Sequence, residues 1–348
     1  MKKQTKTVTF SFDSAALVKR LLAATPERAR GVIIERFGLG TNPERETLEA
    51  IGDRSSITRE RVRQIEAAGL DAIRASKVFK ESRVAFDEIV KYIHSLGAMV
   101  PEEALLAGFG KDEKSRNRFR FFLMLDSAFI RERETNDFLA RWHVDAGTAK
   151  SIHDALSKLY SKLSDDEVIT ESDILDRFLD ELKSVNDAYK NEEVLKRWLS
   201  LSKHIGSNPL SQWGKTTAPA IRIKGIRDYA YLAIKRNGAP MHFSDVSKAI
   251  GTLFSKEAHI ATTHNELIKD PRFVLVGRGL YALSEWGYAP GVVRDVIRET
   301  LDKNGPMKKE EIMTHVKKAR FVKDNTILVN LNDSHYFKRL KDGRYSAV

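Results

Sequence analysis

The sequence predicts a mainly α-helical chain, built as a tandem array of an N-terminal helix-turn-helix and three or four winged-helix units with small β-hairpin wings. Two patterns lead to this prediction. Apolar residues recur at helical spacing between capping and breaking residues, and an aromatic, polar-turn, aromatic pattern recurs three times. The 348 residues are 42% hydrophobic and 31% charged, which is typical of a globular protein with several small domains.

The first part of the chain predicts four helices in a helix-turn-helix order. They are expected at residues 13–25, 26–37, 47–52 and 57–74. Asp13 or Ser14 caps the first helix and Pro26 ends it, while Gly38 stops the second. Gly52 is expected to break the third, and a short polar turn then leads into the longest helix. A short helix, a tight turn and a longer helix are typical of a helix-turn-helix.

A hairpin wing is predicted at three places farther along the chain. In each, an Asp-x-x-Phe/Tyr step follows an amphipathic helix, and a second aromatic residue comes eight or nine residues later. The steps are Asp126 with Phe129, Asp270 with Phe273 and Asp333 with Tyr336, and the second aromatics are Phe138, Tyr281 and Tyr345. Turn residues lie between the aromatics, which is typical of a β-hairpin. Short helices followed by one hairpin describe a winged helix.

These patterns predict five successive units. The helix-turn-helix occupies residues 1–80, and winged-helix units are expected at 82–145, 220–288 and 289–348. Residues 148–219 carry acidic helices and then a segment rich in Gly, Asn, Pro and Trp. We interpret that unit as an acidic helical one, with a degenerate winged helix as the alternative. Its charge favours packing or a protein partner over contact with DNA.

Positive charge is concentrated at the two ends of the chain. The net charge is +11, with +6 in residues 1–80, −4 in 81–219, +4 in 220–288 and +5 in 289–348. Clustered positive charge suits a nucleic-acid partner, because neutralising phosphates releases condensed counterions. A generically basic surface is the alternative interpretation.

Composition excludes several classes of protein. The absence of cysteine excludes disulfides, iron-sulfur clusters and cysteine-ligated zinc fingers. The longest stretch without Asp, Glu, Lys or Arg, residues 204–214, is shorter than the roughly 20 apolar residues that a membrane span needs. The N-terminus lacks the apolar region of a secretory signal. We therefore expect a cytoplasmic, nucleoid-associated protein without a membrane partner.

No catalytic motif is found in the sequence. It lacks a P-loop, an HExxH zinc-protease motif and a GxSxG nucleophile turn, and its short glycine strings lack the third glycine of a dinucleotide loop. His259 and His264 are five residues apart and do not share a helical face, so they are not predicted to bind a metal. We therefore predict a protein that is not an enzyme and uses no cofactor or metal.

The longest helix of the N-terminal segment has a face suited to base recognition. At about 100° per residue, its apolar side is formed by Val62, Ile65, Gly69 and Ile73. The opposite side carries Arg59, Glu60, Arg63 and Gln64. Arg can form paired hydrogen bonds to guanine, Gln to adenine, and Glu can accept one from cytosine. An ordinary solvated helix surface is the alternative.

The string RFGLGTNPERETLEAIGDRSSITRERVRQIEAAGLDAIR closely resembles region 4 of primary bacterial (sigma-70 type) sigma factors. The family signature runs RFGL, TLEEIG and TRERVRQIE, and the resemblance covers residues 15–80. It implies that the TRERVRQIE helix reads an upstream promoter element. The residues implied to face bases are Arg59, Glu60, Arg63 and Gln64. Those implied to contact backbone phosphates are Thr47, Arg54 and Arg61.

The chain departs from the sigma-factor pattern in several ways. Region 4 ends the chain in sigma factors, whereas here it begins it, and nothing resembles the aromatic-rich helix that opens a promoter. A complete sigma factor is therefore not expected. Ala50 replaces the second Glu of TLEEIG. Gly69 is expected to loosen the end of the recognition helix, because glycine is a poor helix former.

Residues 225–287 resemble a HARE-type winged helix, as found in the RNA polymerase delta subunit. The resemblance rests on core apolar positions and on the wing pattern FxxVGxGxY. It implies DNA contact by residues at the start of the third helix and at the wing. The candidates are Thr262, Thr263, His264, Asn265, Arg272 and Arg278. Capping and solvation are the alternative roles for these residues.

The last unit is rich in basic residues around its third helix and its wing. The candidates for DNA contact there are Lys323, Lys338, Arg339 and Arg344. Lysine suits phosphates better than base edges, so this unit is expected to strengthen binding without reading sequence. A solvated face is the alternative.

These features predict a sequence-specific DNA-binding transcription regulator related to region 4 of sigma factors. Its predicted partners are double-stranded DNA and the RNA polymerase core. The alternative is an RNA polymerase accessory protein that acts mainly through protein contacts and binds DNA weakly or without sequence preference. A DNA-processing enzyme is disfavoured because catalytic motifs are missing. The complete set of four base-facing side chain types favours the first function.

Overall fold

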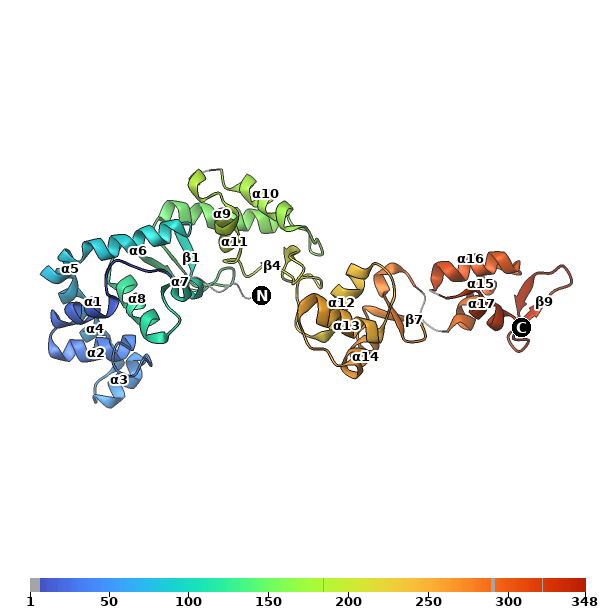
Figure 1. Ribbon diagram of the computed structural model, residues 1–348, viewed down its shortest axis with the longest axis horizontal. Coiled ribbons are helices and arrows are strands. Elements are labelled where there is room, and N and C mark those ends of the chain that lie inside the picture. The colour runs from blue at the N-terminus through green and yellow to red at the C-terminus, as the bar shows by residue number, and fades with distance from the viewer. Residues whose placement is uncertain (1–6, 184, 289–291, 321) are drawn as a thin grey trace. The chain divides into compact units, whose positions relative to one another are not determined.

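The computed structural model describes residues 7–183, 185–288, 292–320 and 322–348. Within these ranges the protein is mainly helical, with seventeen α-helices and small antiparallel hairpins (Figure 1), which confirms the predicted fold class. Internal contacts divide the chain into two compact units. The first unit runs to Ser207 and includes Trp213–Thr216, and the second comprises Asn208–Gln212 and Thr217–Val348.

The first unit begins with the helices of the helix-turn-helix. They are α1 (Ser14–Ala23), α2 (Glu27–Phe37), α3 (Leu48–Arg54), α4 (Arg59–Ala75) and the short α5 (Lys77–Glu81). Asp13 caps α1 by accepting hydrogen bonds from two backbone amides. Gly38 ends α2 in a left-handed conformation with φ of 63°. Thr47 and Thr58 cap α3 and α4 in the same way as Asp13 caps α1.

Two glycines in these helices lie where a Cβ would meet a neighbouring segment. Helix α3 continues past Gly52, so the expected break there is wrong. A Cβ at Gly52 would lie 2.6 Å from the carbonyl oxygen of Ile57, so glycine permits the tight turn between α3 and α4. Helix α4 runs through Gly69 unbroken, and the expected loosening of its end stays a prediction. A Cβ at Gly69 would lie 2.9 Å from Ile33, so glycine lets α2 and α4 cross closely.

The following segment folds as helices packed on a three-stranded sheet. Its elements are α6 (Arg83–Ser95), β1 (Met99–Pro101), α7 (Glu102–Phe109), α8 (Glu113–Leu125), β2 (Ile130–Glu132) and β3 (Arg141–His143). Strands β1 and β2 both pair antiparallel with the central β3. The aromatic residue on the returning strand is Trp142 and not Phe138, so that part of the prediction is wrong. Phe138 lies in the connection and forms a β-bridge with Ser202.

The helix-turn-helix and this segment share one apolar core. A continuous cluster of buried side chains extends from Leu17 in α1 to Trp142 in β3. Phe37 of α2 packs against Phe121 of α8 with ring centroids 5.5 Å apart. The cluster confined to the helix-turn-helix is small and consists of Ala29, Val32, Ile51, Val62 and Ile65. The helix-turn-helix therefore depends on the following segment for much of its apolar burial, and the division of the chain into five units stays a prediction.

The rest of the first unit is a helical segment that ends in a hairpin. Its elements are α9 (Ala146–Lys162), α10 (Glu171–Glu181), the 3₁₀ helix η1 (Asp187–Tyr189), α11 (Glu192–Leu199), β4 (Ile205–Ser207) and β5 (Trp213–Lys215). Strands β4 and β5 pair antiparallel in the Gly- and Trp-containing stretch where the sequence suggests a degenerate wing. Trp198 of α11 is fully buried in the core of this segment.

The second unit contains two sets of three helices, each followed by a hairpin. The first set comprises α12 (Ile226–Asn237), β6 (Met241–His242), α13 (Phe243–Phe254), α14 (Ile260–Lys269), β7 (Phe273–Gly277), β8 (Leu280–Leu283) and the 3₁₀ helix η2 (Ser284–Trp286). The second set comprises α15 (Val293–Asn304), α16 (Lys309–Ala319), α17 (Asp324–Leu331), β9 (Phe337–Arg339) and β10 (Tyr345–Ala347). Tyr281 and Tyr345 lie on the returning strands, as predicted. The predicted boundary at residue 289 lies outside the described residues.

Candidate nucleic-acid interface

The N-terminal end of α4 presents its predicted base-facing side chains to solvent. Arg59, Glu60, Arg63 and Gln64 are all exposed. On the opposite side of the helix, Val62 is fully buried and Ile65 is 8% exposed, both in the small core that α4 shares with α2 and α3. Thr58 holds the first turn by accepting a hydrogen bond from the Arg61 amide at 3.2 Å. The apolar face of α4 is therefore anchored in the core, and its polar face is exposed to solvent.

The exposed side chains of this turn bind one another in the DNA-free protein. Arg63 donates from Nε to Glu60 Oε2 at 2.9 Å and from Nη2 to Glu60 Oε1 at 2.7 Å. Arg61 donates to the side-chain oxygen of Gln64 at 3.1 Å, and Gln64 donates more weakly to Glu60 at 3.4 Å. The hydrogen bond from Arg63 lowers the pKa of Glu60. The contact raises the pKa of Arg63 in turn.

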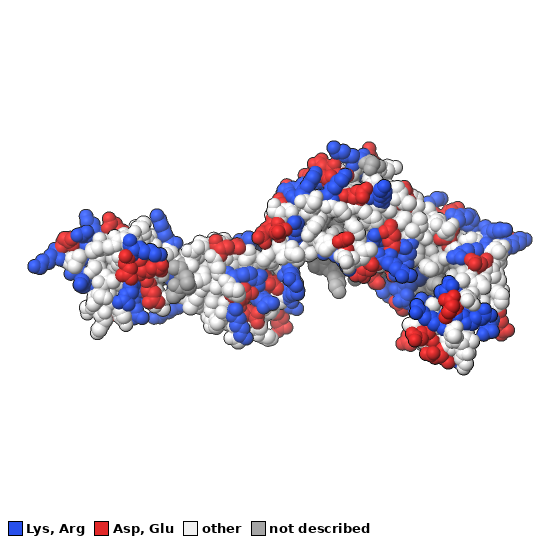
Figure 2. Space-filling view, turned by 180° about the vertical axis from the view of Figure 1, so that it is seen from behind, with Lys and Arg blue, Asp and Glu red and all other residues white. Residues whose placement is uncertain are grey.

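The predicted phosphate contacts of the helix-turn-helix lie at the edges of α3 and α4. Thr47 is exposed and caps α3, accepting a hydrogen bond from the Ala50 amide at 3.1 Å. Its hydroxyl hydrogen remains available to a phosphate oxygen. Arg54 is exposed, but its Nη2 lies 3.1 Å from Glu46 Oε1 and 3.9 Å from Glu35 Oε2. A phosphate bound to Arg54 would therefore compete with two carboxylates. Cations and anions are similarly interspersed over the face drawn in Figure 2.

The candidates on α14 divide into exposed and packed residues. Thr262 and Asn265 are exposed, whereas Thr263 is fully buried. His264 is half-buried and its ring stacks on Phe243, with centroids 4.2 Å apart. The structure therefore leaves the two exposed residues accessible to DNA. The arrangement of Thr263 and His264 is accounted for by packing, and contact of either with DNA stays a prediction.

The two arginine candidates beside the β7–β8 hairpin have different surroundings. Arg278 is exposed at the tip of the β7–β8 turn, beside Gly279, which has φ of 66°. Arg272 donates from Nη2 to Asp228 Oδ1 and to Asp270 Oδ2, both at 2.7 Å. Those carboxylate side chains are only 8% and 9% exposed. These bonds raise the pKa of Arg272 and account for its position without DNA.

The Arg272 contact makes the stability of the second unit dependent on acid pH. The hydrogen bond from Arg272 lowers the pKa of Asp270, so the unfolded chain takes up a proton at a higher pH than the folded one. The stabilisation is present above the unfolded pKa of about 3.9 and is lost as the pH falls through the lower folded pKa. We expect the Asp270→Asn variant to lose part of this dependence when thermal unfolding is followed from about pH 6 to about pH 3. Parallel stability profiles of the two proteins would contradict the assignment.

The candidates of the last unit surround α17 and the β9–β10 hairpin. Lys323 precedes α17, and Lys338 and Arg339 lie on β9; all three are exposed. Arg344 is exposed too, but donates to Asp342 from Nε at 2.7 Å, so a phosphate would have to displace that carboxylate. Among the described residues, the other three candidates form no ion pair, although Arg339 lies 6.0 Å from the centroid of the Tyr345 ring.

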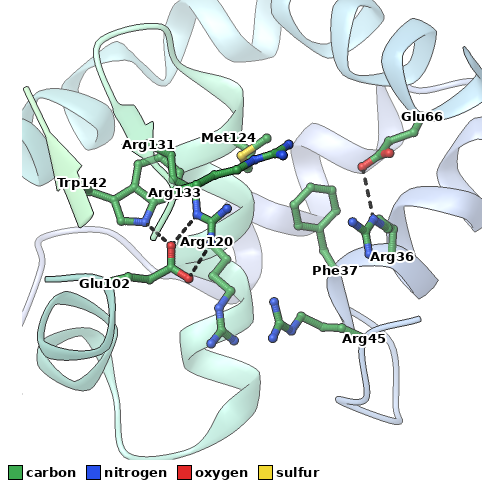
Figure 3. Close-up of a pocket in the computed structure, with 10 residues that line it drawn as sticks. All are labelled: Arg36, Phe37, Arg45, Glu66, Glu102, Arg120, Met124, Arg131, Arg133 and Trp142. Atoms are coloured by element: carbon green, nitrogen blue, oxygen red, sulfur yellow. Dashed lines mark hydrogen bonds and ion pairs between the residues drawn. The ribbon is translucent and has the colours of Figure 1, made fainter. Parts of the chain in front are cut away.

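The structure also brings together five arginines that sequence analysis did not single out. Arg36, Arg45, Arg120, Arg131 and Arg133 line a cavity of about 360 Å³ in the first unit (Figure 3). They come from α2, the loop after it, α8, β2 and the residues following β2, so no spacing in the sequence groups them. Among the described residues, no cluster of His, Asp and Glu is suited to a metal ion. In the same residues, no helix is long and apolar enough to span a membrane.

Comparison with known proteins identifies one part of the chain. Residues 21–75 match the family described as Sigma-70, region 4. The RNA polymerase sigma factor RpoS of Coxiella burnetii is 51% identical over 57 residues, which are 16% of this chain and 16% of that protein. The RNA polymerase sigma factor RpoD of Helicobacter pylori is 41% identical over 63 residues, which are 18% of this chain and 9% of that protein.

The match is confined to the helix-turn-helix. The chain spans less than a fifth of the length of the curated relatives it matches. The likeness of residues 225–287 to a HARE-type winged helix stays a prediction. The matched residues contain α2, α3 and α4 in full, together with the end of α1. The resemblance predicted for the N-terminal segment is confirmed over residues 21–75, which match the Sigma-70, region 4 family.

Proposed function

We propose that this protein is a sequence-specific DNA-binding transcription regulator, cytoplasmic and associated with the nucleoid, with double-stranded DNA as its main partner and the RNA polymerase core as a second one. The observation that carries the proposal is the exposed turn of α4, where Arg59, Glu60, Arg63 and Gln64 stand on a helix anchored by its opposite face. The function is one of binding and recruitment, with no catalytic step.

The chemistry of this turn suits the major groove of DNA. The groove is wide enough to admit a helix, and each base pair presents there a distinct pattern of donors and acceptors. Arg63 supplies a pair of donors, Gln64 supplies one donor and one acceptor, and Glu60 supplies an acceptor. Thr47 and Arg54 at the ends of α3, with Arg61, would hold backbone phosphates on either side, because phosphate contacts fix the register of a recognition helix.

The exposed candidate residues of the second unit add affinity in this proposal without adding sequence preference. The residues with this role are Thr262, Asn265, Arg278, Lys323, Lys338, Arg339 and Arg344. Most of them are cations, which suit phosphates. Linked modules raise affinity through effective concentration.

Replacing Arg63 by Ala should weaken binding to the preferred site by about 1–3 kcal/mol, because one paired contact to a base is lost. Binding to random duplex DNA should change little, and the same holds for Gln64→Ala. The measurement is fluorescence anisotropy of the full chain on both duplexes at one salt concentration. Arg28→Ala is the matched control, since Arg28 is an exposed arginine of α2. Equal losses on both duplexes would mean that Arg63 contacts only phosphates.

Selection of bound sequences from a random duplex pool tests the proposed function directly. An enriched motif supports sequence-specific regulation, and the motif should change when Arg63 is replaced. An unenriched pool would instead favour the accessory protein that works mainly through contacts with RNA polymerase. The mutual pairing of Glu60 with Arg63 in the DNA-free protein is compatible with that second function.

A further inference from the structure

A cavity of about 360 Å³ opens inside the first unit, where the helix-turn-helix meets the segment that shares its core (Figure 3). One wall is formed by α2, α4 and the loop between α2 and α3. The other wall is formed by α7, α8, β2 and β3. Five arginines and two glutamates line it, which leaves three positive charges in excess.

The two glutamates of the cavity already interact with other side chains of the protein. Glu102 accepts hydrogen bonds from Arg131 Nη2 at 3.0 Å and from Trp142 Nε1 at 2.9 Å. Burial alone would raise the pKa of Glu102, but the bonds from Arg131 and Trp142 hold it below its usual value. Glu66 lies 3.7 Å from Arg36. Neither carboxylate is therefore free to neutralise the remaining cations.

Three arginines of the cavity keep unused hydrogen-bonding capacity. Among the described residues, the side chains of Arg45 and Arg133 have no hydrogen bond or ion pair. Arg120 donates from Nη1 to Glu113 at 2.6 Å and to Asn117 at 2.9 Å. Its Nε is buried and has no partner. Arg45 and Arg133 are exposed, so their donors, together with the buried Nε of Arg120, are available to a ligand without loss of a hydrogen bond or ion pair among the described residues.

The cations also repel one another. Figure 3 shows the guanidinium ends of Arg45 and Arg120 approaching each other from opposite walls. Burial lowers the pKa of Arg45, and the charge of Arg120 lowers it further. Arg45 is exposed, so water screens part of this repulsion. Like charges held together along one cavity still repel, and a bound anion would relieve the repulsion.

Phosphate is the anion that best matches these donors. The planar fork of a guanidinium binds phosphate oxygens in pairs. The volume falls at the lower end of the roughly 300–1,000 Å³ range of small-molecule sites. Phe37 and Met124 add an apolar wall beside the arginines.

We propose that this cavity binds a small phosphorylated anion of the nucleoside polyphosphate class through Arg45, Arg120 and Arg133. Its phosphates would bridge the loop after α2 and helix α8. A bound ligand would therefore tie the helix-turn-helix to the segment that shares its core. The inference does not depend on the proposed DNA-binding function.

The test is calorimetric titration of the full chain with pyrophosphate and with ATP at one low salt concentration. Arg45→Ala and Arg133→Ala should each weaken binding roughly tenfold to a hundredfold, the effect of losing a hydrogen bond to a charged group. Neither side chain forms a hydrogen bond or ion pair within the part of the chain that the structure describes, so both variants should keep the thermal unfolding curve of the wild type. Arg28→Ala, an exposed arginine outside the cavity, should bind as the wild type does.

Equal affinity for pyrophosphate and ATP would assign recognition to the phosphates alone and overturn the nucleoside part of the proposal. Tighter binding of ATP would support it and add a role for the apolar wall. Failure of both ligands to bind, or an equal loss in Arg28→Ala, would overturn it. The cavity arginines could instead bind the phosphates of a DNA backbone. If neither small ligand bound but Arg45→Ala weakened duplex binding more than Arg28→Ala did, the arginines would serve DNA and the proposal would be wrong.

Discussion

A fragment that ends at residue 80 is expected to lose cooperative folding, although it contains every residue that matches the Sigma-70, region 4 family. Leu21, Ile33, Phe37 and Ile73 belong to the core that continues into α6 and α8. Full burial of each such side chain contributes about 1.5–3 kcal/mol, and a domain as a whole is stable by only about 5–15 kcal/mol. Far-ultraviolet circular dichroism during heating should show a broad, non-cooperative transition for residues 1–80. A fragment of residues 1–216 should unfold sharply.

A point change in the full chain tests the same contact without truncation. Phe121→Ala removes the ring that packs on Phe37 and should destabilise the first unit by about 3–5 kcal/mol. Met124→Ala on the same helix is the control, because Met124 is 42% exposed and its loss should matter little. Cooperative unfolding of residues 1–80, together with a small effect of Phe121→Ala, would show that the helix-turn-helix is self-sufficient.

Arg272→Ala is expected to destabilise the second unit by about 3–5 kcal/mol, because it leaves the buried Asp228 and Asp270 carboxylates without their cation. Chemical denaturation of the full chain, followed by a signal from the second unit, measures this loss. Arg278→Ala is the control, since that arginine is exposed at the wing tip and should change stability by less than about 0.5 kcal/mol.

The same pair of variants separates structural from DNA-binding roles. Reduced DNA affinity in Arg278→Ala at unchanged stability would support the predicted contact at the wing tip. Unchanged stability but reduced DNA affinity in Arg272→Ala would be the opposite of what the Asp228 and Asp270 contacts imply. Arg272 would then act on DNA and its ion pairs would be incidental.

Local chemistry made the helices and two of the hairpins predictable from sequence. Asp13, Thr47 and Thr58 accept backbone hydrogen bonds at helix starts, and Gly38 takes the left-handed conformation that ends α2. These effects act within a few residues and leave a pattern in the sequence. The exposed turn of α4 was predictable for the same reason, because helical periodicity separates its polar and apolar faces.

Features that depend on tertiary contact were not predictable in this way. Gly69 is a poor helix former by propensity, but it makes room for Ala29 and Ile33 of α2, which only the fold brings close. Trp142 replaces Phe138 on the returning strand because β3 must also pair with β1, from a distant part of the sequence. No sequence pattern predicts the arginine cavity, because Arg45 and Arg133 come to line one cavity only after two segments share a core.

The ion pair on the exposed turn of α4 has a consequence for selectivity under the proposed function. Glu60 competes with DNA for Arg63, because Arg63 donates two hydrogen bonds to the Glu60 carboxylate in the DNA-free protein. A duplex that offers Arg63 only a phosphate must therefore displace this carboxylate first. A site that presents guanine to Arg63 and the amino group of cytosine to Glu60 satisfies both side chains after they separate. The free-energy cost of separating Glu60 from Arg63 is then offset by base contacts at the matching sequence, and it is not offset at other sequences. The ion pair therefore increases specificity by lowering the affinity for non-matching sites, and it does not raise the affinity for the matching site.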